Sequence, residues 1–135
     1  MQLDPTAFVA DPDLIAALTR NAAPVACASE RILFLQGDAP IGLYILRNGD
    51  VRLTMDSLDG RPLVSVQAPA GSLLGLPGLL GNQPYTLTAI AEPGAIVHFI
   101  PEDEFKALMQ SEPQLSLKIL AVLAAEVRSA RRAIG

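Results

Sequence analysis

The stretch from Gly71 to Ala91 constrains the fold of this chain more than any other. It lies between runs of strand-like residues and contains four glycines, Gly71, Gly75, Gly78 and Gly81. Closely spaced glycines let the backbone adopt positive φ values and approach another group closely. Pro77 suits the first turn of a short helix, whose free amides can hold an anion. The stretch therefore predicts a loop with a helical turn that holds a small ligand.

The same stretch carries no charge. No charged residue occurs from Pro62 through Ala91, so nothing within it could form an ion pair with a phosphate. Its prolines and glycines, together with the polar Gln67, Asn82 and Gln83, exclude a transmembrane helix. We therefore expect no membrane contact and a ligand, if any, that the loop holds by groups other than charged side chains.

Composition indicates one folded domain over residues 1–135. Half of the residues are apolar and 18% are charged, which is typical of a globular chain. The net charge of -4 argues against a domain that binds nucleic acid through an overall positive charge. Cys27 is the only cysteine, which excludes an internal disulfide and a multi-cysteine metal site. No secretory signal is visible at the N-terminus, so we expect a cytoplasmic protein.

Capping and turn residues divide the chain into three segments. In residues 1–23, Asp11 and Pro12 predict the start of a helix that ends near Asn21. Residues 24–100 are predicted to form strands. Two short strands lie between Pro24 and Leu35, and further strands follow, with turns at Asp59-Gly60 and at 92–94. Strands at this spacing favour a barrel or sandwich. Residues 101–135 are predicted to be helical.

The Asn48-Gly49 pair gives the clearest local signal. It separates the apolar-rich runs 43–47 and 50–55. Asn-Gly between such runs is typical of a two-residue β-hairpin turn, in which both residues need positive φ. The sequence therefore predicts a hairpin between these two strands.

Two helices are predicted after the strands. Pro101 and three carboxylates begin the first, where the helix dipole favours negative charge. A longer helix follows Pro113 and runs to the end of the chain. It carries apolar residues in alternating steps of three and four, Leu120, Leu123, Val127, Ala130 and Ile134. This is a coiled-coil spacing. It predicts a homodimer through this helix, with packing of the same face on its own β domain as the alternative.

In this arrangement the chain resembles the cyclic-nucleotide-binding domain of catabolite-activator and FNR-type bacterial regulators, the Crp/Fnr family. The resemblance extends from about Leu14 to Ala133. It is carried by Gly37-Asp38, the run Leu43 to Val51, Gly60, the run Gly71 to Gly75, Ala91, Phe105 and Pro113. It implies a mainly β fold with flanking helices: an eight-stranded β-roll, or double-stranded β-helix of jelly-roll type, between an N-terminal helix and a C-terminal dimer helix.

The resemblance also implies a ligand site. The phosphate-binding cassette of that family usually has a glutamate directly after a glycine, then a short helix, and then an arginine followed by serine or threonine. Here Leu76 follows Gly75, and Tyr85 stands at the arginine position before Thr86. Arg47 or Arg52 could reach in only if its strand face points inward. The candidate ligand residues are Ser72, Gly75, Leu76, Gly78, Leu79, Tyr85 and Thr86.

Several of these residues have a second interpretation. Tyr85 could be a pocket hydroxyl or a packed strand-entry residue, and Thr86 could be a phosphate donor or an ordinary strand residue. Leu76 and Leu79 could line a pocket or belong to the core. A cyclic nucleotide or another small ligand remains open as the bound molecule, since losing two charged hydrogen bonds of roughly 1.5–3 kcal/mol each weakens nucleotide binding on the order of a hundred-fold to ten-thousand-fold.

Three functions follow from the resemblance. The chain is a ligand-sensing regulatory domain, a ligand-free scaffold that binds a protein partner, or the effector half of a transcription regulator whose DNA-binding domain is absent from this sequence. An enzyme of cupin type is not expected. Such sites usually need two or three histidines and a carboxylate, whereas His98 is the only histidine and no nucleophile is placed near it by a recognisable motif.

Overall fold

The computed structural model describes residues 3–134, and side chains through Arg132. The elements in chain order are a 3-10 helix η1 (Pro5–Phe8), α1 (Pro12–Arg20), β1 (Ala23–Val25), β2 (Arg31–Phe34), β3 (Gly42–Asn48), β4 (Val51–Asp56), β5 (Pro62–Ala68), β6 (Leu73–Leu74), α2 (Leu76–Gly81), β7 (Thr88–Ala91), β8 (Ile96–Pro101), α3 (Glu102–Ser111) and α4 (Pro113–Ile134). This order confirms the predicted strands between an N-terminal helix and two C-terminal helices.

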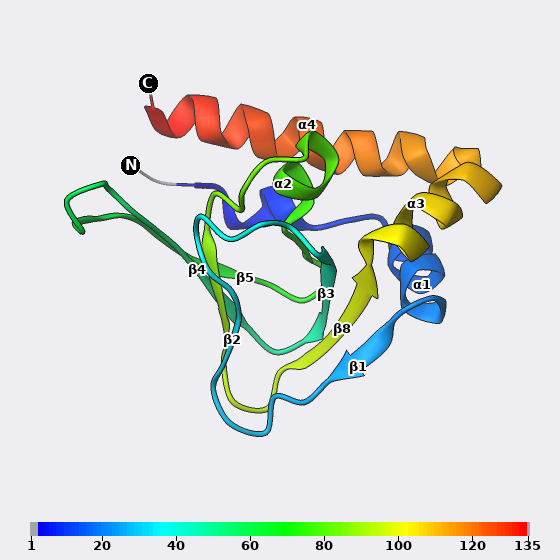
Figure 1. Cartoon of the computed structure of the whole chain (residues 1–135), viewed down its shortest axis with the longest axis horizontal. Coiled ribbons are helices and arrows are strands. Elements are labelled where there is room, and N and C mark those ends of the chain that lie inside the picture. Colours follow the sequence, from blue (N-terminus) through cyan, green and yellow to red (C-terminus); the bar gives the residue numbers. More distant parts are fainter. Residues whose placement is uncertain (1–2, 135) are drawn as a thin grey trace.

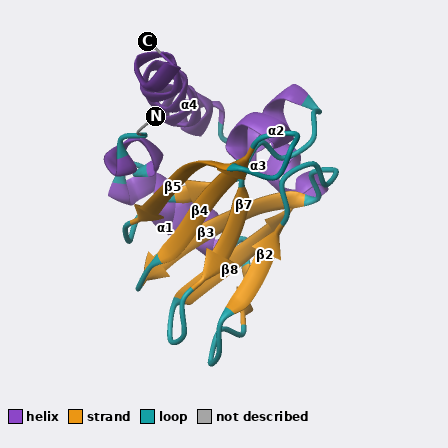
Figure 2. Ribbon diagram, turned by 90° about the vertical axis from the view of Figure 1, so that its left-hand side faces the viewer, coloured by secondary structure: helices purple, strands orange, loops and turns teal. Residues whose placement is uncertain are grey.

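The eight strands form two antiparallel four-stranded sheets. One has the order β1-β8-β3-β6 and the other β2-β7-β4-β5. Figure 2 shows strands of both sheets, with α4 outside them. In Figure 1, α4 lies across the top of the roll above α2, with α1 and α3 near its first turns. The fold class predicted from the sequence, an eight-stranded β-roll with flanking helices, is therefore confirmed.

The prediction of a hairpin at Asn48-Gly49 was wrong. β3 pairs with β6 and β8 in one sheet, whereas β4 pairs with β5 and β7 in the other. Only Gly49 takes a positive φ, 84°, and Asn48 stays in the strand. A Cβ on Gly49 would lie 2.9 Å from the Cα of Ala95. Glycine is thus required here because the chain turns a corner between the sheets, close to another backbone.

The true hairpin joins β4 and β5. Val51 pairs with Ala68 at one end of this ladder, and Met55 pairs with Val64 near the other. The turn between them contains Gly60 at a φ of 84°. The turn predicted at Asp59-Gly60 is therefore confirmed, and it is this turn that reverses the chain within one sheet.

β3 separates two apolar clusters. Leu43 and Ile45 face a cluster that also contains residues of all four α-helices, whereas Tyr44 and Leu46 face the space between the sheets. This alternation is the period of two expected for a strand. Burial on both faces holds the strand in the interior, where each apolar side chain that becomes fully buried contributes roughly 1.5–3 kcal/mol.

The helices begin where the sequence predicts. The Asp11 carboxylate accepts hydrogen bonds from the backbone amides of Asp13 and Leu14, at 2.8 and 3.3 Å. α3 begins after Pro101 with three carboxylates in its first turn. No helix among residues 3–134 is long and apolar enough to cross a membrane. The charge-free residues 62–91 form β5, β6, α2 and β7 instead.

α4 packs on the domain through one face and exposes another. The packed face comprises Leu115, Ile119, Val122, Glu126 and Ser129. Of the residues predicted to form a dimer seam, Leu120 and Val127 are 54% and 49% exposed. Leu123 and Ala130 are half-buried, and the side chain of Ile134 lies outside the described part of the chain. Leu120 and Val127 are thus not explained by packing on the chain's own β domain.

Candidate ligand site

The glycine-rich loop forms the predicted helical turn. Gly75 precedes α2 with a φ of 93°, and Pro77 lies in the first turn of this helix. A Cβ on Gly75 would lie 2.8 Å from Cε1 of Tyr85, and a Cβ on Gly78 would lie 3.0 Å from the carbonyl oxygen of Gln83. Both glycines are therefore needed for the close approach of the loop to the segment that carries Tyr85.

Tyr85 fills the space beside this turn. Its side chain is 3% exposed, and its ring stacks on Phe34 with the ring centroids 4.1 Å apart. Its hydroxyl donates to the Gly42 carbonyl at 3.0 Å and accepts from the Ile41 amide at 3.1 Å. Tyr85 is thus a packed residue whose hydroxyl points away from the loop, toward the start of β3.

The other candidate residues are divided between the loop and the core. Gly75, Gly78, Tyr85 and Thr86 line one small cavity. Leu76 and Leu79 instead lie in the apolar cluster of the helices, which matches their interpretation as core residues. Ser72 is fully buried, and its hydroxyl donates to the Pro69 carbonyl at 2.6 Å. Of the seven candidates, only Gly75, Gly78, Tyr85 and Thr86 therefore border the cavity.

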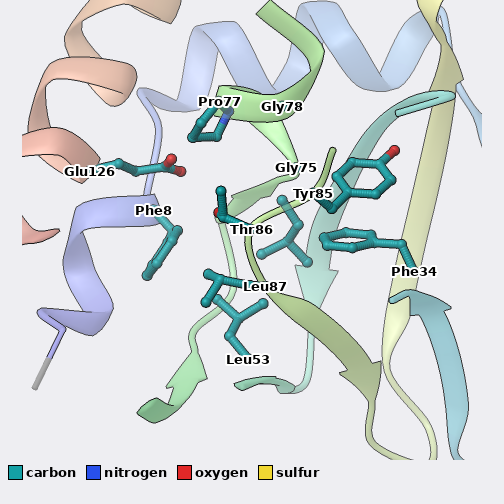
Figure 3. A pocket seen from close by; sticks show the side chains of 11 residues that line it. Phe8, Phe34, Leu53, Gly75, Pro77, Gly78, Tyr85, Thr86, Leu87 and Glu126 are labelled. Atoms are coloured by element: carbon teal, nitrogen blue, oxygen red, sulfur yellow. The ribbon is translucent and has the colours of Figure 1, made fainter. Parts of the chain in front are cut away.

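Two adjoining cavities lie between this loop and α4. The first, beside Tyr85, has a volume of about 30 Å³, which is room for one or two water molecules. The second has a volume of about 260 Å³ and extends to Met55 and Val127. Phe8, Pro77, Thr86, Leu87 and Glu126 border both. Figure 3 shows Phe8, Thr86 and Leu87 facing one another across this space.

Glu126 is the site residue that sequence reasoning missed. It projects from α4, and Figure 3 shows its carboxyl directed toward Pro77 and Thr86. Its side chain is 8% exposed, and its Oε1 atom has no hydrogen-bond partner within residues 3–134. Burial raises the pKa of this carboxyl to about 8. The signal in the sequence is a single acidic residue among apolar ones at the packed spacing of the last helix.

Comparison with known proteins identifies the fold and the family. Residues 24–112 match the family described as "Cyclic nucleotide-binding domain". The chain belongs to this family. The structure is also similar to a catabolite activator protein of Thermus thermophilus, with a TM-score of 0.79 and 22% identity over 97% of this chain and 62% of that one. The N-terminal domain of a Streptomyces coelicolor transcriptional regulator gives a TM-score of 0.67, with 24% identity over 96% and 93% of the two chains.

Sequence relatives of this cyclic nucleotide-binding domain include larger proteins. A CRP-like cAMP-activated global transcriptional regulator of Mycobacterium tuberculosis is 29% identical over 121 residues, which are 87% of this chain and 53% of that protein. The lysophospholipase nte1 of Neurospora crassa is 33% identical over 103 residues, 75% of this chain and 7% of that protein. The chain thus spans about half the length of the first relative and a small part of the second.

The arginines of the cyclic nucleotide-binding domain lie away from the two cavities. Arg47 is exposed, and Arg52 forms an ion pair with Glu92, whose Oε1 lies 2.9 Å from its Nη1. Neither arginine lines a cavity, and no Lys or Arg does so among the described residues. Among the described residues, Glu126 is the only acidic side chain at either cavity. Without a cationic side chain, the two cavities disfavour an anion and suit a neutral or cationic group.

Proposed function

We propose that this chain is a non-catalytic regulatory domain that senses a small ligand other than a cyclic nucleotide and transmits its binding through an α4 dimer. The observation that carries the proposal is the position of Tyr85. Its ring occupies the space beside the glycine-rich turn, and its hydroxyl is engaged by Ile41 and Gly42. A degenerate phosphate-binding cassette is the interpretation that this packing supports.

The size of the cavity beside Tyr85 and the absence of the two charged side chains support the same proposal. Leu76 stands where the resembled family has a glutamate, and it is buried among the helices rather than directed at the cavity. The cavity beside Tyr85, about 30 Å³, is far smaller than a cyclic nucleotide. Losing two charged hydrogen bonds of roughly 1.5–3 kcal/mol each already moves a micromolar dissociation constant toward the millimolar range.

Isothermal titration calorimetry with cyclic AMP and cyclic GMP tests the ligand part of the proposal. The Mycobacterium relative, whose name records activation by cAMP, is the positive control. We expect no binding by the wild type up to millimolar nucleotide. A folded Tyr85→Arg variant should gain measurable binding, whereas Tyr85→Leu, which removes the ring without adding charge, should not. Micromolar binding by the wild type would contradict the proposal.

The exposed seam on α4 supports the proposed dimer, through which ligand binding would be transmitted. Leu120 and Val127 are apolar and about half exposed, and they lie in the alternating spacing of a coiled coil. A second copy of this chain, carrying the same stripe, would bury both. We expect sedimentation velocity to show a dimer for the wild type and a monomer for Val127→Glu. The matched control is Arg128→Glu, about 100° around the helix from Val127 and outside the seam, which should remain a dimer.

A second candidate function is the effector half of a transcription regulator. It is favoured by the match to 53% of the Mycobacterium regulator and to 62% of the Thermus catabolite activator protein. In both comparisons the matched region is a part of a longer chain. Immunoblotting of the native protein tests this candidate, which requires a mass well above the 14.2 kDa of these 135 residues.

A further inference from the structure

The larger of the two cavities has mostly apolar walls and two polar side chains, Thr86 and Glu126. Its volume is about 260 Å³, and it is bordered by η1, Met55 of β4, Pro77 of α2 and the last turns of α4. A cavity of about 150 Å³ holds one benzene molecule, so this one accommodates roughly ten non-hydrogen atoms. That is about half the size of a cyclic nucleotide. The cavity therefore selects a smaller molecule with an apolar body.

Glu126 is the ionisable side chain at this cavity, and its Oε1 atom lacks a hydrogen-bond partner among the described residues. Ser129, one turn further along the packed face of α4, accepts a hydrogen bond from the Asp4 amide at 2.8 Å. The Oε1 atom of Glu126 has no such bond to any described residue, although the side chain is more than nine-tenths buried. A buried acceptor without a donor costs about 1–3 kcal/mol or more. An ammonium group in the cavity would remove that cost once a rotation of the Glu126 side chain brings Oε1 to the cavity surface.

The surroundings of Glu126 define which donor fits. The lining residues include no Lys or Arg, and the Tyr85 hydroxyl is engaged elsewhere by Gly42. Asp4 and Arg132 line a separate hollow together with Ser129. The aromatic ring of Phe8 lines the same cavity as Glu126 (Figure 3). A carboxyl group that ionises on binding and an aromatic face in the same cavity favour a cation with an apolar body.

We propose that this cavity binds a small apolar amine whose ammonium group donates to the Glu126 carboxylate and whose body lies against Phe8 and Met55. This rests on the proposed sensory function and names the ligand class of that site. Val127 follows Glu126 directly and belongs to both the cavity wall and the exposed seam. An occupant held by Glu126 thus contacts the helix that carries the proposed dimer interface.

Calorimetry with three probes of one shape tests the proposal. Phenethylamine, phenethyl alcohol and phenylacetate differ mainly in the charge of one polar group. We expect phenethylamine to bind the wild type at least about tenfold more tightly than the alcohol, which corresponds to about 1.4 kcal/mol, and phenylacetate not to bind. Glu126→Gln should abolish the preference for the amine. Glu104→Gln, at an exposed site on α3, should leave it unchanged.

Proton release gives an independent readout. Because burial raises the pKa of Glu126 to about 8, the carboxyl of the empty cavity is mostly protonated at pH 7. Binding of an ammonium ion should ionise it, so the wild type should release close to one proton to the buffer. Titrations in buffers of different ionisation enthalpy measure this number. The Glu126→Gln variant should release none.

The outcomes separate this inference from the function on which it rests. Equal affinities for the three probes, no binding of any probe, or an amine preference that survives Glu126→Gln would each overturn the inference. Suppose that the inference about the amine fails in this way. If the wild type then does not bind cyclic nucleotides and remains a dimer, the proposed function stands without the inference. Micromolar nucleotide binding overturns the proposed function, whatever the amine does.

Discussion

Removal of one hydroxyl tests whether Tyr85 is a fixed part of the fold. In Tyr85→Phe the ring still stacks on Phe34, but the hydrogen bonds to the Ile41 amide and the Gly42 carbonyl are lost. The matched control is Tyr44→Phe. Tyr44 is also buried and in aromatic contact with Phe34, but its hydroxyl is not among the hydrogen-bonded groups of the described chain.

The expected magnitude follows from the two partners. A buried group left without its hydrogen bond costs about 1–3 kcal/mol. The Gly42 carbonyl is at a buried site and should contribute within this range, whereas the Ile41 amide, in a residue 60% exposed, can recover a bond to water. We therefore expect Tyr85→Phe to lower the free energy of unfolding by about 2 kcal/mol, and Tyr44→Phe to lower it by less than about 0.5 kcal/mol.

Urea unfolding at one fixed protein concentration measures both variants. With a slope of roughly 2 kcal/mol per molar urea, the midpoint of Tyr85→Phe should fall by about 1 M, and that of Tyr44→Phe should hardly move. Equal shifts for the two variants, or no shift for Tyr85→Phe, would show that the hydroxyl does not fix the ring. The reasoning that Tyr85 is locked beside the glycine-rich turn would then fail.

Two further predictions concern the same region. Gly75→Ala should destabilise the protein by about 1–3 kcal/mol more than Gly60→Ala, because both glycines have positive φ but only at Gly75 would the new methyl group meet the Tyr85 ring; thermal or urea unfolding of the pair measures the difference. The folded protein holds the proton of Glu126 up to a pKa of about 8 rather than 4.5, so wild-type stability should fall as the pH rises between these values. Glu126→Gln should remove this fall, which we expect to be on the order of 2–4 kcal/mol between pH 5 and pH 8 in urea titrations; parallel pH profiles for the two proteins would contradict it.

Local signals were sufficient for the helices and the glycine-rich turn. Asp11 and Pro12 start α1 because the cap uses only neighbouring amides. The turn at Gly75 was predicted because positive φ is a property of one residue. Neither inference depends on a distant partner. The family resemblance, carried by glycines and apolar runs of this kind, then predicted the eight-stranded fold.

Features that depend on distant contacts were not predictable from local pattern. Asn48-Gly49 has the residues of a hairpin turn, but whether β4 pairs with β3 or with β7 depends on strands far along the chain. Tyr85 is fixed by groups more than 40 residues away, at Ile41 and Gly42. Glu126 faces a cavity whose other walls include η1, β4, α2 and the segment before β7. Its role therefore emerges only when these elements are assembled.

Sedimentation velocity, with and without saturating phenethylamine, tests most directly whether a ligand in the cavity controls the α4 dimer. Val127 borders the cavity and lies on the exposed seam, so ligand and partner should influence each other. We predict that the dimer dissociation constant changes by about fivefold or more and, because the dimer holds two amines, that the affinity of each site for the amine differs between dimer and monomer by the square root of that factor. Identical dissociation constants with and without bound amine would contradict a sensory domain whose output is this dimer.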